Sequence, residues 1–529
     1  MCSYQNSIKD NEEPKNKSRL NITLIALYQD SATGLRYLSS VLKAEGHNCS
    51  LIFLNNGEDP RLFESSNLTN LIALIKELKT DIIGISVFST YFNIAREVTT
   101  EIKKGLDIPV IWGGPHPTFC PDHSILHCDL LCVGEGEICM KQLASKVKNG
   151  RKIENVPNLW LKEGSTIIKN EPAPLIIDLD TLPFPDFDLQ GKFYVNDNKI
   201  QSSQGLIQEM NRKVFHIITS RGCPFPCTYC SNAVLNQIYG GKWVKFRRRS
   251  PENVVDELIQ AKELLNLSSV GFNDEIFGID ISWISKFALL YKKYVNLPFG
   301  CCVHPNLIDL ETFSLLKEAG LESVSMGIES GSNRMLNEVY NRHTPKERIA
   351  KSHSIISELK LFKSYDIMLD NPYDTTADLR ETFRFLLSLK KPFVLHTFSY
   401  VHLPKTALTE RALKDNLISK EDVEGFGQSK YVWRVHWSPS ARNSEDTLLK
   451  VLISMTGNTF IPNWFLFLLS RSKLLLKKTG LLARFVLNPS FERFQALSQS
   501  IYYSTPREAI YMIFTIIKRL PRLFRRRAP

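Results

Sequence analysis

The sequence predicts an α/β protein with an N-terminal doubly wound, Rossmann-like domain, a partial (β/α)6 barrel and a mainly α-helical C-terminal region. Three observations predict this class. Strand-like and helix-like segments alternate over residues 21–150, and the alternation resumes over 213–410. Beyond about residue 410 it stops, and helices rich in Leu and Phe dominate. A chain of 529 residues is also too long for a single core, so several domains are expected.

The first domain should hold five buried strands in one parallel sheet. The expected strands are residues 22–27, 49–54, 81–87, 109–114 and 130–134, and the expected helices are 34–46, 68–79 and 91–104. Glycines lie at or near several strand ends, where they let a ligand approach the backbone: Gly84, Gly113, Gly114, Gly134 and Gly136. This is a weak nucleotide-binding signal, because the G-x-G-x-x-G fingerprint is absent.

The domain boundaries follow from changes in composition. A polar, charged tail over 1–19 precedes the domain 20–150, an irregular connector 151–212, the barrel 213–410 and a helical domain 411–529. The tail lacks the apolar core of a signal peptide. No uninterrupted apolar run reaches the ~18 residues that a membrane-spanning helix requires.

The barrel should contain six parallel strands, each separated by a helix-like segment. They are expected at residues 214–220, 268–272, 299–303, 323–328, 364–369 and 394–400. Ser250 and Pro251 mark the start of one of the intervening helices. In the last domain, helices are expected at 448–456, 462–472 and 474–486.

The most informative motif is a cysteine triplet that follows the first barrel strand. Cys223, Cys227 and Cys230 have C-x3-C-x2-C spacing, and thiolates are soft ligands suited to iron–sulfur clusters or zinc. A closed zinc site or an ordinary 4Fe-4S cluster takes four ligands, but no fourth Cys follows nearby. A cluster held here would keep one metal corner open for a substrate or cofactor. The alternatives are a structural zinc loop or unrelated thiols.

With Tyr229 in the aromatic position of C-x3-C-x-aromatic-C, the triplet resembles the signature of the radical S-adenosylmethionine (SAM) enzymes. The resemblance implies a 4Fe-4S cluster on the three cysteines, with SAM chelating the fourth iron. Two further segments are similar to family motifs, 271–277 and the M-G-I-E-S-G stretch 326–331. They imply that Glu275 (or Asp274), Gly327 and Glu329 contact SAM.

Other segments depart from the family pattern or leave roles open. The loop 370–375 differs from the common G-x-P-G-E-T form, so backbone contacts to adenine are not carried over. Residues 401–408 are similar to the family's P-x-T-x-L end. His396 and His402 are either substrate or proton-carrying groups at the barrel mouth or packed core residues. Cys120, Cys128, Cys132 and Cys139 are expected to be packed thiols and not a second cluster.

The first domain resembles the cobalamin-binding domain that precedes this barrel in cobalamin-dependent radical SAM enzymes. The similar stretches are 85–90, 113–118 and 133–137. They imply cobalamin contacts from Ser86, Thr90, Gly113, Gly114, His116, Gly134 and Glu135. The D-x-H-x-x-G motif that supplies a lower axial His elsewhere is absent, so we expect base-off cobalamin without a His ligand. A lower ligand from His116 is the alternative.

The resemblance implies a methyltransferase acting on an unactivated carbon. An external one-electron reductant of the flavodoxin or ferredoxin type would reduce the cluster, SAM would yield a 5′-deoxyadenosyl radical, and methylcobalamin would supply the methyl group. A cyclase, oxidase or rearrangement enzyme with the same cofactors is one alternative, and a non-catalytic cobalamin or cluster sensor is another. No catalytic residue beyond the cluster ligands is assigned.

Charge and cysteine content bear on partners and location. Eleven cysteines, an odd number, favour a reducing cytosol over a secreted disulfide framework. The net charge of +11 and the basic, Leu/Phe-rich end allow peripheral contact with an anionic membrane and a lipid substrate. The same charge allows a tRNA-modifying enzyme, but nucleic acid is not the favoured partner.

Overall fold

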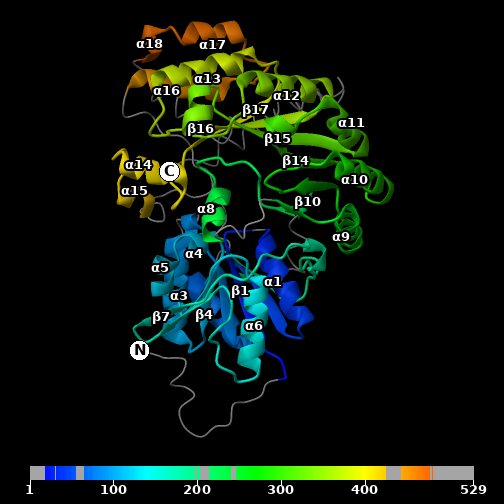
Figure 1. Cartoon of the computed structure of the whole chain (residues 1–529), viewed down its shortest axis with the longest axis vertical. Coiled ribbons are helices and arrows are strands. Elements are labelled where there is room, and N and C mark those ends of the chain that lie inside the picture. The colour runs from blue at the N-terminus through cyan, green and yellow to red at the C-terminus, as the bar shows by residue number, and fades with distance from the viewer. Residues whose placement is uncertain are drawn as a thin grey trace. The chain divides into compact units, whose positions relative to one another are not determined.

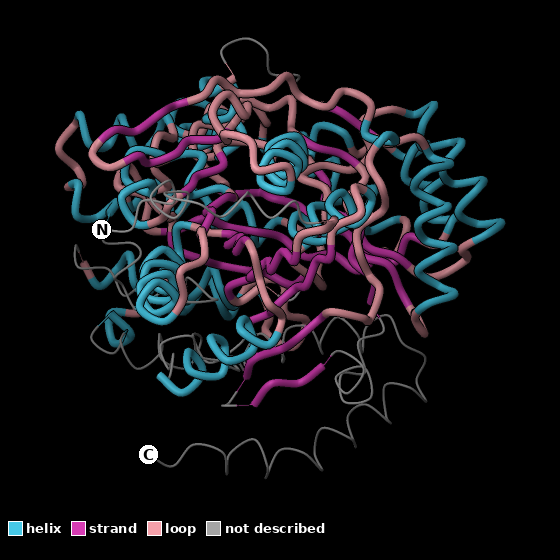
Figure 2. The backbone as a smooth tube through the Cα atoms, turned by 90° about the horizontal axis from the view of Figure 1, so that it is seen from below, coloured by secondary structure: helices cyan, strands magenta, loops and turns pink. Residues whose placement is uncertain are grey.

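A computed structural model of the chain describes residues 18–29, 31–54, 65–196, 199–202, 214–239, 246–424, 443–476 and 479. The other residues are drawn in grey in Figures 1 and 2. The chain divides into two compact units. The first unit comprises Met1–Val270 and Val401–Trp433, and the second comprises Gly271–Tyr400 and Arg434–Pro529.

The first unit contains the predicted doubly wound sheet. Its five central strands are β1 (Asn21–Leu27), β2 (Asn48–Leu54), β3 (Ile82–Ser86), β4 (Val110–Gly113) and β5 (Leu130–Cys132). They are all parallel and lie in the order β5-β4-β3-β1-β2. The order reverses between β1 and β3, which is where open α/β sheets bind ligands above the carboxyl ends.

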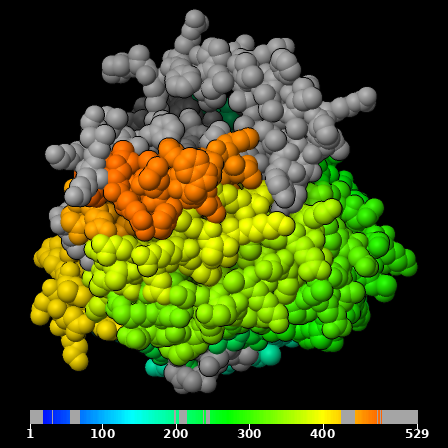
Figure 3. Space-filling model, turned by 90° about the horizontal axis from the view of Figure 1, so that it is seen from above, coloured from blue at the N-terminus to red at the C-terminus, as the bar shows by residue number. Residues whose placement is uncertain are grey.

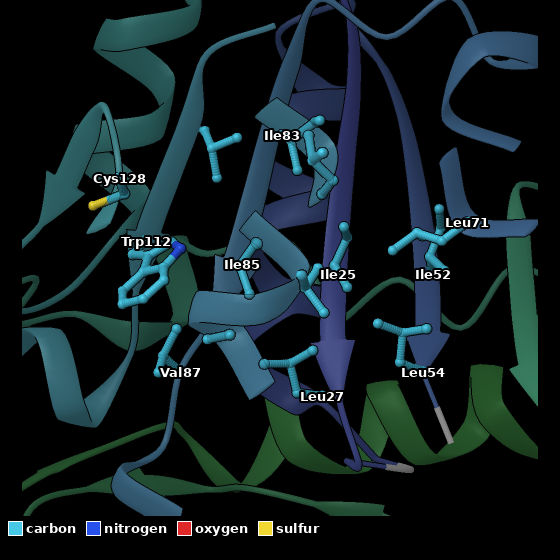
Figure 4. Packing of buried hydrophobic residues seen from close by; sticks show 14 of the residues in the cluster. Ile25, Leu27, Ile52, Leu54, Leu71, Ile83, Ile85, Val87, Trp112 and Cys128 are labelled. Atoms are coloured by element: carbon cyan, nitrogen blue, oxygen red, sulfur yellow. The ribbon is translucent and has the colours of Figure 1, made fainter. Parts of the chain in front are cut away.

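Alternating side chains of the central strands form two separate cores, one on each face of this sheet. Ile25 and Ile85 belong to the core that packs under α2 (Ser65–Glu77) and α3 (Phe92–Gly105), and Figure 4 shows this face. Leu24 belongs to the opposite core, under α1 (Thr33–Ala44) and α6 (Glu137–Lys148). Buried side chains on both faces of the strands explain their continuous apolar runs.

The connector 151–212 is more regular than the sequence indicated. It adds the antiparallel pair β6 (Leu159–Glu163) and β7 (Thr166–Lys169) to one edge of the sheet. The strands β8 (Lys192–Asn196) and β9 (Lys199–Ser202) extend the other edge. The prediction of an irregular connector is therefore wrong here, because four- and five-residue edge strands give too short a pattern to recognise.

The second sheet has the strand order expected for a partial barrel. Its strands are β10 (Val214–Ile217), β13 (Ser269–Phe272), β14 (Phe299–Val303), β15 (Leu321–Glu329), β16 (Phe362–Leu369) and β17 (Val394–Ser399), in that order across the sheet. The pairs from β14 to β17 are parallel. The intervening helices include α9 (Pro251–Leu264), α10 (Ile281–Tyr294), α11 (Leu310–Ala319), α12 (Lys346–Glu358) and α13 (Thr376–Ser388).

The described part of the C-terminal region is helical, as predicted, and one of its helices completes the second unit. Helix α16 (Ser444–Met455) lies beside α13 (Figure 1) and also contacts β17. Polar pairs fix it there: Thr376 donates to Asp446 over 2.7 Å, and the hydroxyls of Thr397 and Ser454 lie 3.0 Å apart. The helix expected at 474–486 is described only for α18 (Lys473–Leu476) and residue 479.

Candidate active site

The cysteine triplet occupies a tight loop in the first unit. Strand β10 ends at Ile217, earlier than predicted, and Ser220–Arg221 form β11, which pairs with β12 (Arg247–Arg248). Gly222 then turns the chain with a φ of +89°, which favours glycine. Cys227 is buried, whereas Cys223 and Cys230 are half-buried.

Local hydrogen bonds hold the loop together. The Cys230 amide donates to the Cys227 carbonyl over 3.2 Å, and the Asn232 amide group lies 3.7 Å from the Cys230 sulfur. Cys230 is the N-cap of α8 (Ser231–Ile238), at the positive end of the helix dipole. Helix α14 (Ala407–Lys414) begins within the P-x-T-x-L segment, and the Leu408 amide donates to the Thr228 carbonyl over 3.0 Å.

By number and type of donor, the loop fits an iron–sulfur cluster with one open corner. A 4Fe-4S cluster takes one thiolate on each of three different irons, so the three sulfurs need not meet at one ion. Within the described residues, no three His, Cys, Asp or Glu side chains are grouped as a single-ion site.

In the second unit, the end of β15 brings Glu329 and Arg342 together. Glu329 has a φ of +66°, and its Oε1 atom lies 3.6 Å from Nη1 of Arg342. Nη2 of Arg342 donates to the Gly327 carbonyl over 2.7 Å. A Cβ atom on residue 327 would lie 2.2 Å from Oε1 of Glu329, so glycine is what leaves room for this carboxylate.

The other residue predicted to contact SAM, Glu275, is exposed after the end of β13. Its neighbour Asp274 is buried, at 2% exposure. Of the two alternatives that the sequence left open at this strand end, Asp274 is the enclosed one. Which of them contacts SAM stays a prediction.

The inner face of the second sheet is lined with small and polar residues. On β15 and β16, Val324, Met326, Tyr365 and Ile367 are buried, whereas the alternating residues between them are only partly buried. These alternating residues and their neighbours on β14 and β17 are Cys302, Ser325, Gly327, Ser364, Asp366 and His396.

Asp366 is a site candidate that was not predicted from the sequence. Its register partners are Gly327 on β15 and His396 on β17, so the three share one row across the sheet. Burial raises the pKa of Asp366 to about 6, and the charge of Arg342 only partly offsets it. The alternation of polar and apolar residues in Phe362–Leu369 is the signal that could have identified it.

Two other residues predicted near the barrel mouth differ in exposure. His396 is exposed, and His402 is half-buried, with its pKa lowered by burial. In the loop after β16, which departs from the family pattern, the Tyr373 amide donates to Asn371 over 2.9 Å. Thr375 then caps α13 in a capping box with Asp378.

The residues predicted to contact cobalamin gather at the carboxyl edge of the first sheet. Ser86 and Gly113 end β3 and β4, Thr90 belongs to a single turn at Ser89–Tyr91, and Gly134 follows β5. Backbone bonds join these loops: the Val87 amide donates to the Gly113 carbonyl over 2.8 Å, and the His116 amide to the Val87 carbonyl over 3.0 Å. Gly114 and Gly134 have φ values of +99° and +91°.

His116 is enclosed by aromatic rings. Its ring centroid lies 4.8 Å from that of Phe92 and 6.2 Å from that of His123, and Nδ1 lies 3.0 Å from the Ser89 hydroxyl. Burial, reinforced by the neighbouring histidines, lowers its pKa to about 4, so the imidazole is neutral. Nε2 is buried without a hydrogen-bond partner.

Two family models match the chain. Residues 26–144 match the B12 binding domain, and residues 217–386 match the radical SAM superfamily. These ranges coincide with the first parallel sheet and with most of the barrel.

The chain is also similar to individual proteins and to solved structures. An uncharacterised methyltransferase of Pyrococcus horikoshii is 26% identical, over 73% of this chain and 79% of the relative. The anaerobic magnesium-protoporphyrin IX monomethyl ester cyclase of Cereibacter sphaeroides is 24% identical, over 68% of this chain and 56% of the relative. Among solved structures, the methyltransferase TsrM from Kitasatospora setae, with cobalamin and a 4Fe-4S cluster bound, has a TM-score of 0.60 at 17% identity, over 75% of this chain and 78% of that chain.

The fold and the matched models define an enzyme with a B12-binding domain and a radical SAM domain in one chain. The chain belongs to the cobalamin-dependent radical SAM enzymes, and its cofactors are a 4Fe-4S cluster, SAM and cobalamin.

Proposed function

We propose that this enzyme methylates an unactivated carbon of a small-molecule or lipid substrate. The observation that carries the proposal is that one chain contains both the three-cysteine loop and a B12-binding domain, whose sheet reverses its strand order between β1 and β3. One relative, which matches this chain over 79% of its own length, is named an uncharacterised methyltransferase.

Each group of residues has a role in this proposal. Cys223, Cys227 and Cys230 hold the cluster, and Glu329 with Asp274 or Glu275 orients the amino group of SAM. The strand-end loops around Gly114 and Gly134 hold cobalamin. When bound, these cofactors supply radical formation and methyl transfer, while the protein positions the reactants and excludes water. An external one-electron reductant would supply the electron that reduces the cluster.

A cyclisation without methyl transfer is the second candidate, and the similarity to a porphyrin cyclase favours it. One anaerobic assay with reconstituted cluster, hydroxocobalamin, SAM and a strong reductant distinguishes these candidate functions. Methyl transfer predicts both 5′-deoxyadenosine and S-adenosylhomocysteine. Cyclase chemistry predicts 5′-deoxyadenosine without S-adenosylhomocysteine. A non-catalytic sensor predicts neither product, and Cys230→Ala would leave its function intact.

The basic C-terminal tail, for which peripheral membrane contact is predicted from the sequence, lies outside the described residues. We also propose that the enzyme contacts an anionic membrane through α17 (Asn463–Leu469). Trp464 and Leu468 are 68% and 60% exposed there, and Phe465 and Phe467 are exposed as well. Figure 3 shows α17 at the surface, in orange. The guanidinium of Arg471 lies 4.4 Å from the Phe467 ring centre. Exposed aromatic and Leu side chains beside cations are typical of interfacial helices. In the described chain, no helix is long and apolar enough to cross a membrane.

Vesicle sedimentation tests this contact. Phosphatidylglycerol vesicles should retain the wild-type enzyme, and Leu468→Ser should weaken retention, because it removes apolar area from the contact. Leu289→Ser on α10 is the matched control, since Leu289 is 70% exposed but lies on another helix. Equal retention of the two variants would refute the role of α17.

A further inference from the structure

Both ends of the segment that carries the cysteine triplet are attached to residues 134–137, which form the loop after β5 and the first residue of α6. Arg221 stands two residues before Cys223 and makes the first attachment. Its Nη1 atom lies 3.2 Å from Oε1 of Glu135, and its Nη2 atom lies 2.6 Å from Oε1 of Glu137. These ion pairs connect the residue that enters the cluster loop to the B12-binding domain.

Tyr239 makes the second attachment, at the end of α8, the helix that leaves the cluster loop. Its hydroxyl accepts a hydrogen bond from the Glu135 amide over 2.9 Å. A Cβ atom on residue 134 would lie only 2.2 Å from this hydroxyl, so the close approach requires Gly134. The glycine expected at the cobalamin edge therefore also admits a side chain from the cluster segment.

Arg247 reinforces the same carboxylate. It is the register partner of Arg221 in the β11–β12 pair. Its Nη1 and Nη2 atoms lie 3.1 Å and 2.6 Å from the two oxygens of Glu135, and its side chain is only 1% exposed. Removing the charge of Glu135 would leave a buried guanidinium with less compensation, which is costly.

The pKa shifts of Glu135 and Arg221 support a lasting ion pair between them. Burial alone would raise the pKa of Glu135, but hydrogen bonding to Arg247 and the charges of both arginines hold it below its ordinary value. The charges of Glu137 and Glu135 raise the pKa of Arg221 despite its burial. The Glu135 carboxylate and the Arg221 guanidinium therefore stay ionised throughout the neutral range.

We infer that Glu135 is a positioning residue that couples cobalamin binding to SAM binding at the cluster. Gly134 and Glu135 lie on the loop at the carboxyl end of β5, at the edge where cobalamin binds in the proposed function, on which this inference rests. A shift of this loop on cobalamin binding moves Arg221 and Tyr239, and with them the two ends of the cysteine segment. Coupling of this kind is reciprocal, so each ligand strengthens the other by the same factor.

Equilibrium dialysis of radiolabelled SAM tests the coupling on the reconstituted, oxidised full-length enzyme, with and without hydroxocobalamin. In the wild type, hydroxocobalamin should lower the Kd of SAM at least about 5-fold. In Glu135→Gln the two Kd values should be equal, while the iron content stays at that of the wild type. Glu45→Gln, which removes a surface ion pair with Lys141, should keep the wild-type coupling.

Tyr239→Phe is the second variant. It removes the acceptor of the Glu135 amide without changing any charge, and should reduce the coupling even if Glu135→Gln fails to fold. Wild-type coupling in Glu135→Gln or in Tyr239→Phe, or its absence from the wild-type enzyme, would overturn the inference. Failure to bind a cluster or SAM at all would instead refute the proposed function, so the two failures are distinguishable.

Discussion

Oε1 of Glu329 lies 3.6 Å from Nη1 of Arg342 at the end of β15, in the space that Gly327 leaves open. The whole Glu329 residue is only 9% exposed, and it has a left-handed backbone conformation, with φ of +66°. Both features carry an energetic cost in a non-glycine residue. A group held at this cost by its surroundings is a good candidate for binding a cationic ligand.

Glu329→Gln should therefore weaken SAM binding. The change replaces a charged acceptor for the SAM ammonium with a neutral one, and a hydrogen bond to a charged group contributes about 1.5–3 kcal/mol. The Kd of SAM, measured by equilibrium dialysis, should rise roughly 10- to 100-fold. Glu322→Gln, at an exposed position on the same strand, is the control. An unchanged Kd in Glu329→Gln would contradict the assignment.

Replacement of any one cysteine of the triplet should abolish the cluster. Cys223→Ala, Cys227→Ala or Cys230→Ala leaves two thiolates, too few to hold a cluster of this type. Iron and acid-labile sulfide per chain should fall to near zero after reconstitution, and 5′-deoxyadenosine formation should stop. Cys120→Ser, outside the triplet, should retain both. A variant of the triplet with wild-type iron content would show that the assigned ligand is wrong.

Asp366→Asn should stabilise the enzyme, and more so at high pH. The folded-state pKa is about 6, above the ordinary 3.8, so the folded enzyme binds this proton more tightly than the unfolded chain does. The stability linked to this proton is complete below about pH 4 and is lost as the pH rises through 6. Removing the carboxyl group should therefore raise the unfolding free energy by roughly 1–3 kcal/mol at pH 8.

Chemical denaturation at pH 5 and pH 8 measures this difference. The gain for Asp366→Asn should be larger at pH 8, whereas Asp256→Asn, at an exposed position on α9, should show no such dependence. An equal gain for Asp366→Asn at both pH values would mean that the carboxyl group is already ionised without cost in the folded state.

His116 should not ligate the cobalt. Its imidazole is packed against Phe92 and His123, and its Nδ1 atom lies beside Ser89. The electron paramagnetic resonance spectrum of bound cob(II)alamin should therefore lack nitrogen superhyperfine splitting from a lower ligand. His116→Ala should leave that spectrum unchanged. Splitting that disappears in His116→Ala would establish the alternative, a lower His ligand.

The fold was largely predictable, because its strands are buried on both faces or separated by regular helices. The prediction of β14 at 299–303 is confirmed to the residue, and most other strands agree within two residues. The edge strands β6 to β9 were not predicted, since short edge strands lack a distinctive hydrophobic pattern.

The candidate site was predictable only where a motif fixes chemistry by spacing. The cysteine triplet is such a motif. Asp366 acquires its raised pKa from burial on the inner face of the sheet, and Glu135 meets Arg221 and Arg247 only after distant segments pack together. No local pattern around Glu135 encodes its ion pairs, so Glu135 could be assigned from the sequence to the cobalamin edge but not to the cluster segment.

The most direct test of methyl transfer follows the bound cobalamin itself. The holoenzyme is reduced anaerobically to cob(I)alamin, SAM is added, and the absorbance spectrum and products are recorded. Methyl transfer predicts conversion to methylcobalamin with an equal amount of S-adenosylhomocysteine, without any added substrate. Formation of 5′-deoxyadenosine while cob(I)alamin remains unmethylated would contradict the account.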